Sequence, residues 1–241
     1  MPQLKPPLPD SSNCDTCPIR GNSMCHYLLG GRATLPKQEH RVSKPRQNLY
    51  RAETPNDYVH VLCEGWAYRL VSLSGGRRMI LAFLLPGDLI SATAVFSDRI
   101  GSSVQMITAG RYCLYRREEV QRILFDKDPA LSVWGKYNRA EQEDTEQKLA
   151  DIGRRSAEER IARLILGIVR RLHLKGLQGQ NDFPFPLTQQ HIADATGLTP
   201  IHVSRTLNVF RQREIMSLSH GHLVIHDQKR LHHAADLDPG A

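Results

Sequence analysis

Short runs of alternating apolar and polar residues occupy the first half of the chain, from about residue 35 to residue 115. Three of these runs predict β-strands, at residues 58–62, 66–73 and 79–85. Glu64-Gly65 and Ser74-Gly75-Gly76 supply turn residues between them. Many short strands at near-regular spacing favour an antiparallel barrel or roll.

The pattern becomes helical after Asp128-Pro129. Residues 130–153 are polar in the middle, and their apolar residues lie towards the two ends: Trp134, Tyr137, Leu149 and Ile152. This composition predicts a long, mostly exposed helix that needs a partner to cover a thin apolar stripe. A solvated surface helix is the alternative.

A second helix is predicted to start at Ser156-Ala157-Glu158-Glu159, which has the sequence of a capping box. Its apolar residues then fall on one face: Ile161, Leu164, Ile165, Ile168 and Leu172. We place a domain boundary near residue 155 and a loop over residues 173–187, which are rich in Gly, Gln and Pro.

A helix-turn-helix is predicted near residues 188–212. Thr188 can cap a short helix, and Thr196-Gly197-Leu198 can form a tight turn in which glycine adopts a positive φ. Thr199 then caps a second helix with Pro200 at its first position, where a missing N–H does no harm. Small Ala193 would let the two helices approach each other.

The second of these helices has an inward face, formed by Val203, Leu207 and Phe210, and an outward face, formed by Ile201, Ser204, Arg205 and Asn208 with His202 at its edge. An arginine on such a face can bond guanine O6 and N7, whereas Ile201 offers only apolar contact, for instance to a thymine methyl. Arg211 and Arg213 could reach phosphates.

Residues 215–225 predict a hairpin that could form a wing; a helical hairpin used only for packing is the alternative.

Charge and composition agree with a polyanionic partner. The chain has 32 Lys and Arg against 25 Asp and Glu, which gives a net charge of +7 and a pI of about 9.3. No apolar run approaches the roughly 18 residues of a membrane span. The polar, Pro-rich N-terminus has no secretory signal, so a cytoplasmic location is expected.

The five cysteines do not form a secreted disulfide pattern, because their number is odd and three are clustered near one end: Cys14, Cys17, Cys25, Cys63 and Cys113. In a reducing compartment such a cluster indicates metal binding or redox chemistry. Motifs typical of enzymes are missing from the sequence, including Gly-x-Ser-x-Gly, a phosphate loop and His-Glu-x-x-His. We therefore expect no enzymatic activity.

The chain resembles the CRP/FNR family of bacterial regulators over nearly its whole length. The resemblance is carried by Glu64-Gly65, Pro86-Gly87-Asp88-Leu89, Ser156 to Ile161 and Gly197 to Arg205. It implies an α+β fold: a leader with the cysteine cluster (1–34), an antiparallel β-roll of the cyclic-nucleotide-binding, jelly-roll type (35–129), a dimerisation helix (130–155) and a winged helix-turn-helix (156–241).

The resemblance also implies partners. These are a second copy of the chain, a two-fold symmetric double-stranded DNA site with half-sites about one helical turn apart, and RNA polymerase. Four residues fall where relatives touch the DNA backbone: Gln189, Gln190, Thr199 and His220. Relatives commonly carry Glu at the position of Ile201, so the usual target sequence of the family is in doubt.

Cyclic nucleotide is not the expected signal. Relatives that bind it use a glutamate shortly after Gly-Asp-Leu and an Arg-Ser pair, whereas this chain has Ser91-Ala92-Thr93 and Ile100-Gly101 there.

The oxygen-sensing FNR branch is more similar, and it implies a [4Fe-4S] cluster on Cys14, Cys17, Cys25 and Cys113. We interpret Cys63 as a small buried hydrophobic residue without a ligand partner.

Several alternatives stay open for the sensor: structural zinc on the same four cysteines or on three of them with His26, a thiol redox switch, a cyclic-nucleotide-type regulator, or a regulator without a ligand. Under the cluster hypothesis, an intact cluster packs the N-terminal segment on the roll and favours dimerisation. The acidic residues at 141–146 would keep the dimer close to dissociation.

Overall fold

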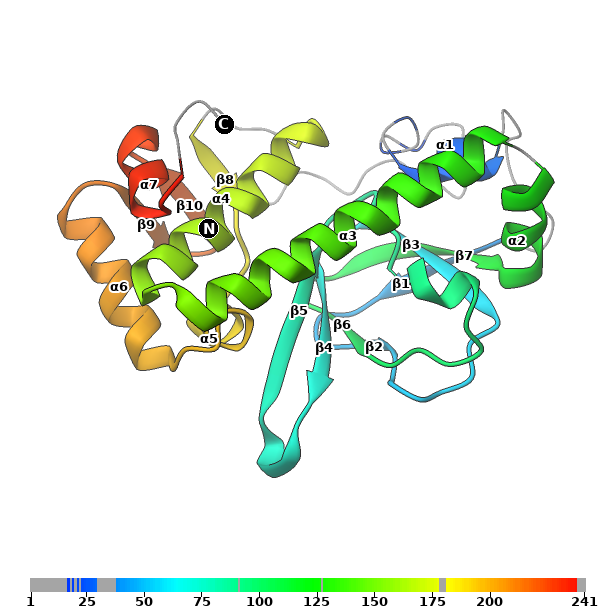
Figure 1. The fold of residues 1–241 in the computed structure, drawn as a ribbon, viewed down its shortest axis with the longest axis horizontal. Helices are drawn as coiled ribbons and strands as arrows, with labels where there is room; N and C mark the ends of the chain where they lie inside the picture. Colours follow the sequence, from blue (N-terminus) through cyan, green and yellow to red (C-terminus); the bar gives the residue numbers. More distant parts are fainter. Residues whose placement is uncertain are drawn as a thin grey trace.

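The computed structural model describes residues 17, 19, 21, 23–29, 38–90, 92–126, 128–177 and 181–237. Its parts are a β-roll, one long helix that runs past the roll, and a C-terminal unit of helices with a small sheet (Figure 1).

The roll consists of two antiparallel sheets. In one, the strand order is β1-β7-β3, with β1 at Glu39–Ser43, β7 at Gly110–Arg116 and β3 at Tyr58–Glu64. In the other the order is β2-β6-β4-β5, with β2 at Asn48–Tyr50, β6 at Ser103–Met106, β4 at Ala67–Ser72 and β5 at Arg78–Leu84. Two short 3-10 helices, η3 (Ser74–Gly76) and η4 (Ala92–Val95), connect strands. The predicted roll and its three predicted strands are confirmed.

The turn between β3 and β4 depends on Gly65. Its φ is 86°, a region that side chains rarely adopt, and a Cβ placed there would lie 2.5 Å from the carbonyl oxygen of Ala109. Both the backbone conformation and the close approach of the neighbouring chain therefore require glycine.

Two short helices beside the roll were not predicted. These are α1 (Met24–Leu29) and α2 (Arg117–Asp126). In α2 the buried residues are Val120, Ile123 and Leu124, which is a single i, i+3, i+4 set. One such set is too short to distinguish a helix from a loop by periodicity, so only packing on the roll reveals these helices.

The long helix α3 (Asp128–Arg154) confirms the prediction for residues 130–153 and runs across the molecule from the roll to the C-terminal unit (Figure 1). Its surface is mostly exposed, and Leu149 as a residue is 75% exposed. Two of the four acidic residues at 141–146 are paired within the chain, Glu141 with Arg69 and Glu143 with Arg139. These pairs reduce the repulsion that the acidic run would otherwise create between two copies of α3.

The C-terminal unit contains four helices among the described residues: α4 (Ala157–Leu174), α5 (Gln189–Thr196), α6 (Pro200–Gln212) and α7 (Gln228–Ala234). Its sheet has the order β8-β10-β9, with β8 at Asp182–Pro184, β9 at Met216–Ser219 and β10 at His222–Ile225. The predicted capping box of α4 is confirmed, because Ser156 Oγ accepts from Glu159 N and the Glu159 carboxylate accepts from Ser156 N.

The prediction of a loop over residues 173–187 was wrong at its start and at residues 182–184. Helix α4 continues to Leu174, and Phe183 in β8 pairs with Leu223 in β10, so the predicted hairpin is part of a three-stranded sheet. A three-residue strand ending in Pro184 has too little pattern to detect, and such a strand is stable only at the edge of a sheet. Helix α7 was also missed.

The roll and the C-terminal unit share one hydrophobic core. Trp66 of the roll contacts Phe185 edge to face, with ring centroids 5.9 Å apart, and both belong to the same buried cluster. At the border of this core, the buried carboxylate of Asp88 pairs with Arg171 and Lys175 at the end of α4, with 2.8 Å to Lys175 Nζ. Asp88 Oδ2 also accepts from Leu85 N at 2.7 Å.

We expect Asp88→Asn to lower the free energy of unfolding by about 3 kcal/mol at pH 7, because it leaves two cations beside the interface without their counter-charge. Burial alone would raise the pKa of the Asp88 carboxyl, but Arg171 and Lys175 outweigh burial and hold the pKa below its usual range. The stabilisation is therefore present above the ordinary pKa of about 4 and disappears as the pH falls below it. Denaturant unfolding at several pH values measures the difference between wild type and variant, and a difference that does not shrink towards acid pH would contradict this origin.

Candidate functional site

The predicted helix-turn-helix is present as α5 and α6. Thr188 Oγ1 accepts from His191 N at 3.2 Å, and Thr199 Oγ1 accepts from His202 N at 3.3 Å, so both predicted caps are confirmed. Gly197 between the helices has a φ of 68°, the left-handed conformation that the predicted turn requires. Ala193 of α5 and Val203 of α6 are fully buried in the same hydrophobic core.

The outward face of α6 is exposed over all five residues that the sequence assigns to base contacts: Ile201, His202, Ser204, Arg205 and Asn208. Helix α6 lies on the side of the C-terminal unit away from the roll (Figure 1). The exposed fraction of Ile201 is 65%, which is high for an apolar side chain on an otherwise polar face. A face of this kind, on a helix fixed by two caps and a buried core, can enter the major groove of DNA.

The residues predicted to touch the DNA backbone are also exposed. Gln189, Gln190 and Thr199 lie at the starts of α5 and α6, and His220 lies at the turn between β9 and β10 with a φ of 51°. Helix N-termini present free N–H groups that can bind phosphate oxygens. The roles of these four residues remain predictions.

Helix α5 is attached to the roll as well as to α6. Arg78 Nε of β5 lies 2.6 Å from Asp194 Oδ2, and the ring of His191 packs on Tyr68 at a centroid distance of 5.3 Å. The same aspartate accepts from Gln190 Nε2 at 2.6 Å through its other oxygen. Gln190, which is predicted to contact the DNA backbone, is therefore linked to the roll through the side chain of Asp194.

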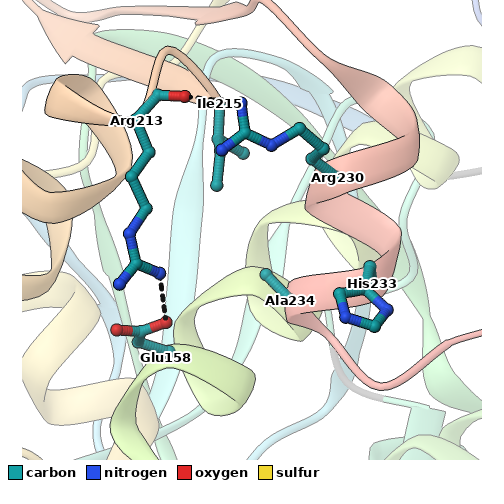
Figure 2. A pocket seen from close by; sticks show the side chains of 6 residues that line it. All are labelled: Glu158, Arg213, Ile215, Arg230, His233 and Ala234. Atoms are coloured by element: carbon teal, nitrogen blue, oxygen red, sulfur yellow. Dashed lines mark hydrogen bonds and ion pairs between the residues drawn. The ribbon is translucent and has the colours of Figure 1, made fainter.

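A pocket lies beside the helix-turn-helix, where the end of α6 meets α4 and α7 (Figure 2). Arg213, which the sequence assigned to phosphate contact, points into this pocket and lies 3.6 Å from the Glu158 carboxylate. Arg230 Nη1 donates to the carbonyl oxygen of Arg213 at 2.8 Å. Arg213 is thus paired within the unit although its side chain is 56% exposed. Arg211 is also exposed and lies beside Asn208, whose Oδ1 accepts from the Arg211 guanidinium at 2.8 Å.

The structure brings two of the predicted cluster ligands into one buried core. Cys25 of α1 and Cys113 of β7 both belong to the hydrophobic cluster beneath α1 and α3, and Tyr115 donates a hydrogen bond to Cys25 Sγ at 3.3 Å. Cys17 is partly buried, and Cys14 lies outside the described residues. Within the described ranges, no three His, Cys, Asp or Glu side chains are placed to hold a metal ion. Cys25 and Cys113 come from distant parts of the chain into one apolar core, and their thiolates are of the kind that ligates an iron–sulfur group.

The interpretation of Cys63 as a buried residue was wrong, and Cys63 has a sulfur neighbour that the sequence did not indicate. Its Sγ lies 3.0 Å from Cys113 Sγ, and the side chain is partly exposed. Cys113 Sγ also lies 3.4 Å from His40 Nδ1. Burial, followed by the nearby charge of Arg111, lowers the pKa of His40. His26, the alternative zinc ligand, is exposed on α1 against the ring of Tyr27.

Comparison with known proteins matches both halves of the chain. Residues 159–234 match the family model described as "Crp-like helix-turn-helix domain", and residues 40–127 match "Cyclic nucleotide-binding domain". The chain is 28% identical to the nitrogen fixation regulation protein FixK of Bradyrhizobium diazoefficiens over 92% of this chain and 94% of the relative. It is 30% identical to FixK of Rhizobium meliloti over 73% and 76% of the two chains. The solved structure of FixK2 from Bradyrhizobium japonicum aligns with a TM-score of 0.75, at 24% identity, over 83% of this chain and 98% of that one.

The fold and the exposed second helix define a DNA-binding protein of the winged helix-turn-helix class. With these matches, the chain belongs to the CRP/FNR family of transcription regulators, whose members are not enzymes. No helix in the described part of the chain is long and apolar enough to cross a membrane.

We expect Thr199→Ala to lower the free energy of unfolding by about 1 kcal/mol, because it removes the oxygen that caps α6. Thr199→Ser keeps that oxygen and is the matched control, which should retain most of the stability. Denaturant unfolding of the three proteins measures both effects. Equal losses in the Ala and Ser variants would show that the methyl group, and not the cap, is responsible.

Proposed function

We propose that this protein acts as a homodimer that binds a two-fold symmetric DNA site through α6 and responds to oxygen through a [4Fe-4S] cluster. The observation that carries the DNA-binding part is the exposed outward face of α6, fixed in place by the caps at Thr188 and Thr199 and by the left-handed turn at Gly197. The bound dimer would then contact RNA polymerase.

Arg205 is the residue that we assign to direct base contact. It lies in the second turn of α6, is exposed, and is flanked on the same face by Ile201 and Asn208. A guanidinium can bond both acceptors of guanine in the major groove, and each such pair discriminates by about 1–3 kcal/mol. Ile201 cannot accept from a base, so the preferred site would carry an apolar surface there, such as a thymine methyl.

Dimerisation through α3 is supported by the apolar surface that this helix leaves exposed. Leu131 and Leu149 retain 40% and 75% of their accessibility, and they lie near opposite ends of the helix. A second copy of α3 packed along the first would cover such residues. Two copies would place two α6 helices in successive major grooves.

The sensor would be formed by Cys14, Cys17, Cys25 and Cys113. Thiolates are the usual ligands of an iron–sulfur cubane, which when bound supplies a centre that oxygen can oxidise. Helix α1 carries Cys25 and packs on α3, and the core around Cys25 includes Trp134 and Tyr137 of α3. A change at Cys25 would therefore reach the dimer helix directly, through packed side chains.

We expect Arg205→Ala to weaken binding to the preferred DNA by roughly 5- to 150-fold, because it removes a base-specific contact. The preferred DNA would first be selected from random sequence without oxygen. Fluorescence anisotropy at one fixed salt concentration then compares this DNA with unrelated DNA. Arg211→Ala is the matched control and should weaken both DNAs to a similar degree, since its expected contact is a phosphate. Unchanged affinity of Arg205→Ala for the selected DNA would contradict the proposed role of α6.

We expect protein purified without oxygen to be brown and to hold about four iron ions per chain. Cys25→Ser should lose the iron, and its DNA affinity should be the same with and without air. Cys63→Ser is the matched control and should keep the iron, because Cys63 is not among the proposed ligands. Metal analysis with anisotropy measures both properties. A colourless protein that holds stoichiometric zinc would overturn the cluster and favour the zinc alternative.

A further inference from the structure

Two thiols from neighbouring strands meet on one face of the first sheet. Cys63 lies in β3 and Cys113 in β7, fifty residues apart in sequence, and their Sγ atoms are 3.0 Å apart. This separation is shorter than the contact distance of two sulfur atoms that only touch, and one thiol donates a hydrogen bond to the other. The two side chains are thus already oriented towards each other.

The register of the two strands explains this approach. Val61 is paired with Cys113 and Leu62 with Tyr112, and the next pair is Glu64 with Arg111, so Cys63 is the extra residue of a β-bulge. Alternation along β3 places Cys63 on the same face as Val61, which belongs to the same buried cluster as Cys113. In a regular ladder Cys63 would be a diagonal neighbour of Cys113, and the bulge shifts it along the strand towards that residue.

The two thiols differ in access to solvent. Cys113 is 2% exposed, whereas Cys63 is partly exposed at the end of its strand. A small oxidant can therefore reach Cys63, while Cys113 is protected but lies within bonding reach of it. An accessible thiol beside a second, resolving thiol is the arrangement of redox-sensitive cysteine pairs.

We propose that Cys63 and Cys113 form a thiol pair that a peroxide converts to a disulfide. The Cys63 sulfur attacks one oxygen of hydrogen peroxide, the O–O bond breaks, and Cys63 becomes a sulfenic acid with release of one water. The Cys113 sulfur then attacks the Cys63 sulfur, the S–O bond breaks, and a second water leaves. The two thiols are oxidised by two electrons, and the peroxide is reduced to water.

The disulfide can form without the metal site, but it would remove one of the proposed metal ligands. Cys113 is the proposed fourth ligand of the cluster, and a sulfur held in a disulfide cannot act as a thiolate ligand. This consequence rests on the proposed function: oxidation of the pair and occupation of the cluster site would exclude each other. The thiol pair itself would form whether or not the chain holds a metal.

The experiment treats the full-length, metal-free protein with hydrogen peroxide in its folded state, blocks remaining thiols with an alkylating reagent, and maps tryptic peptides by mass spectrometry. Cleavage after Arg51, Arg69, Arg111 and Arg116 separates the two cysteines into different peptides. We expect these two peptides to be joined with the loss of two hydrogen atoms and to be released by a thiol reductant. Alkylation of Cys63 and Cys113 should be lost together.

Cys25→Ser is the matched control, because it removes a proposed metal ligand and leaves the pair intact. It should form the joined peptide as readily as wild type, even though it cannot hold the cluster. Cys63→Ser should abolish the joined peptide. The proposal is overturned if Cys63 remains fully alkylated after peroxide treatment of wild type, or if Cys113 is found joined to another cysteine. If Cys25→Ser loses iron but still forms the joined peptide, both the cluster and the thiol pair are supported. If the wild-type protein never binds iron but forms the joined peptide, only the thiol pair is supported.

Discussion

The position of the DNA-binding unit depends on one buried carboxylate. Asp88 lies in the turn after β5 and binds both Arg171 and Lys175, which lie at the end of α4. Arg171 in addition donates to the carbonyl oxygen of Phe83 at 2.8 Å, so the end of α4 is held to the roll by charge and by backbone contact. A carboxylate in this core would be strongly unfavourable without its two cations, and this fixes the orientation of α4 against the roll. The shared apolar cluster then packs around that fixed point.

The long helix α3 connects the proposed sensor to the helix-turn-helix. With 27 residues it spans about 40 Å, with α1 and Cys25 packed near its beginning and the helix-turn-helix near its end. Near the C-terminal end of α3, Arg160 of α4 donates to the carbonyl oxygens of Arg155 and Thr196. It thus links the break between α3 and α4 to the end of α5. Under the proposed function, a displacement at Cys25 would act on α6 through these helices and hydrogen bonds. Such coupling requires that the signal favours one arrangement of the helices over the other.

Cys113 belongs to both of the proposed redox sites. It shares a buried core with Cys25, and it also lies within hydrogen-bond distance of Cys63 and His40. One sulfur can serve a metal centre or a disulfide, but not both at once. The strand register therefore gives a single cysteine two competing partners, one through the N-terminal segment and one through the neighbouring strand.

The sequence by itself determined the elements whose signals are local. The strands around Gly65, the long helix after Asp128, the capping box at Ser156 and the two capped helices around Gly197 all depend on residues within a few positions of one another, and all are present. It also indicated which face of α6 is exposed, because helical periodicity fixes faces. Only the tertiary structure decided what depends on distant partners. Three features join segments far apart in the chain: the pairing of Asp88 with α4, the edge strand at Phe183 and the contact of Cys63 with Cys113. The short helices α1 and α2 likewise depend on packing against distant residues. Neither the register of a strand nor a β-bulge can be deduced from one strand alone.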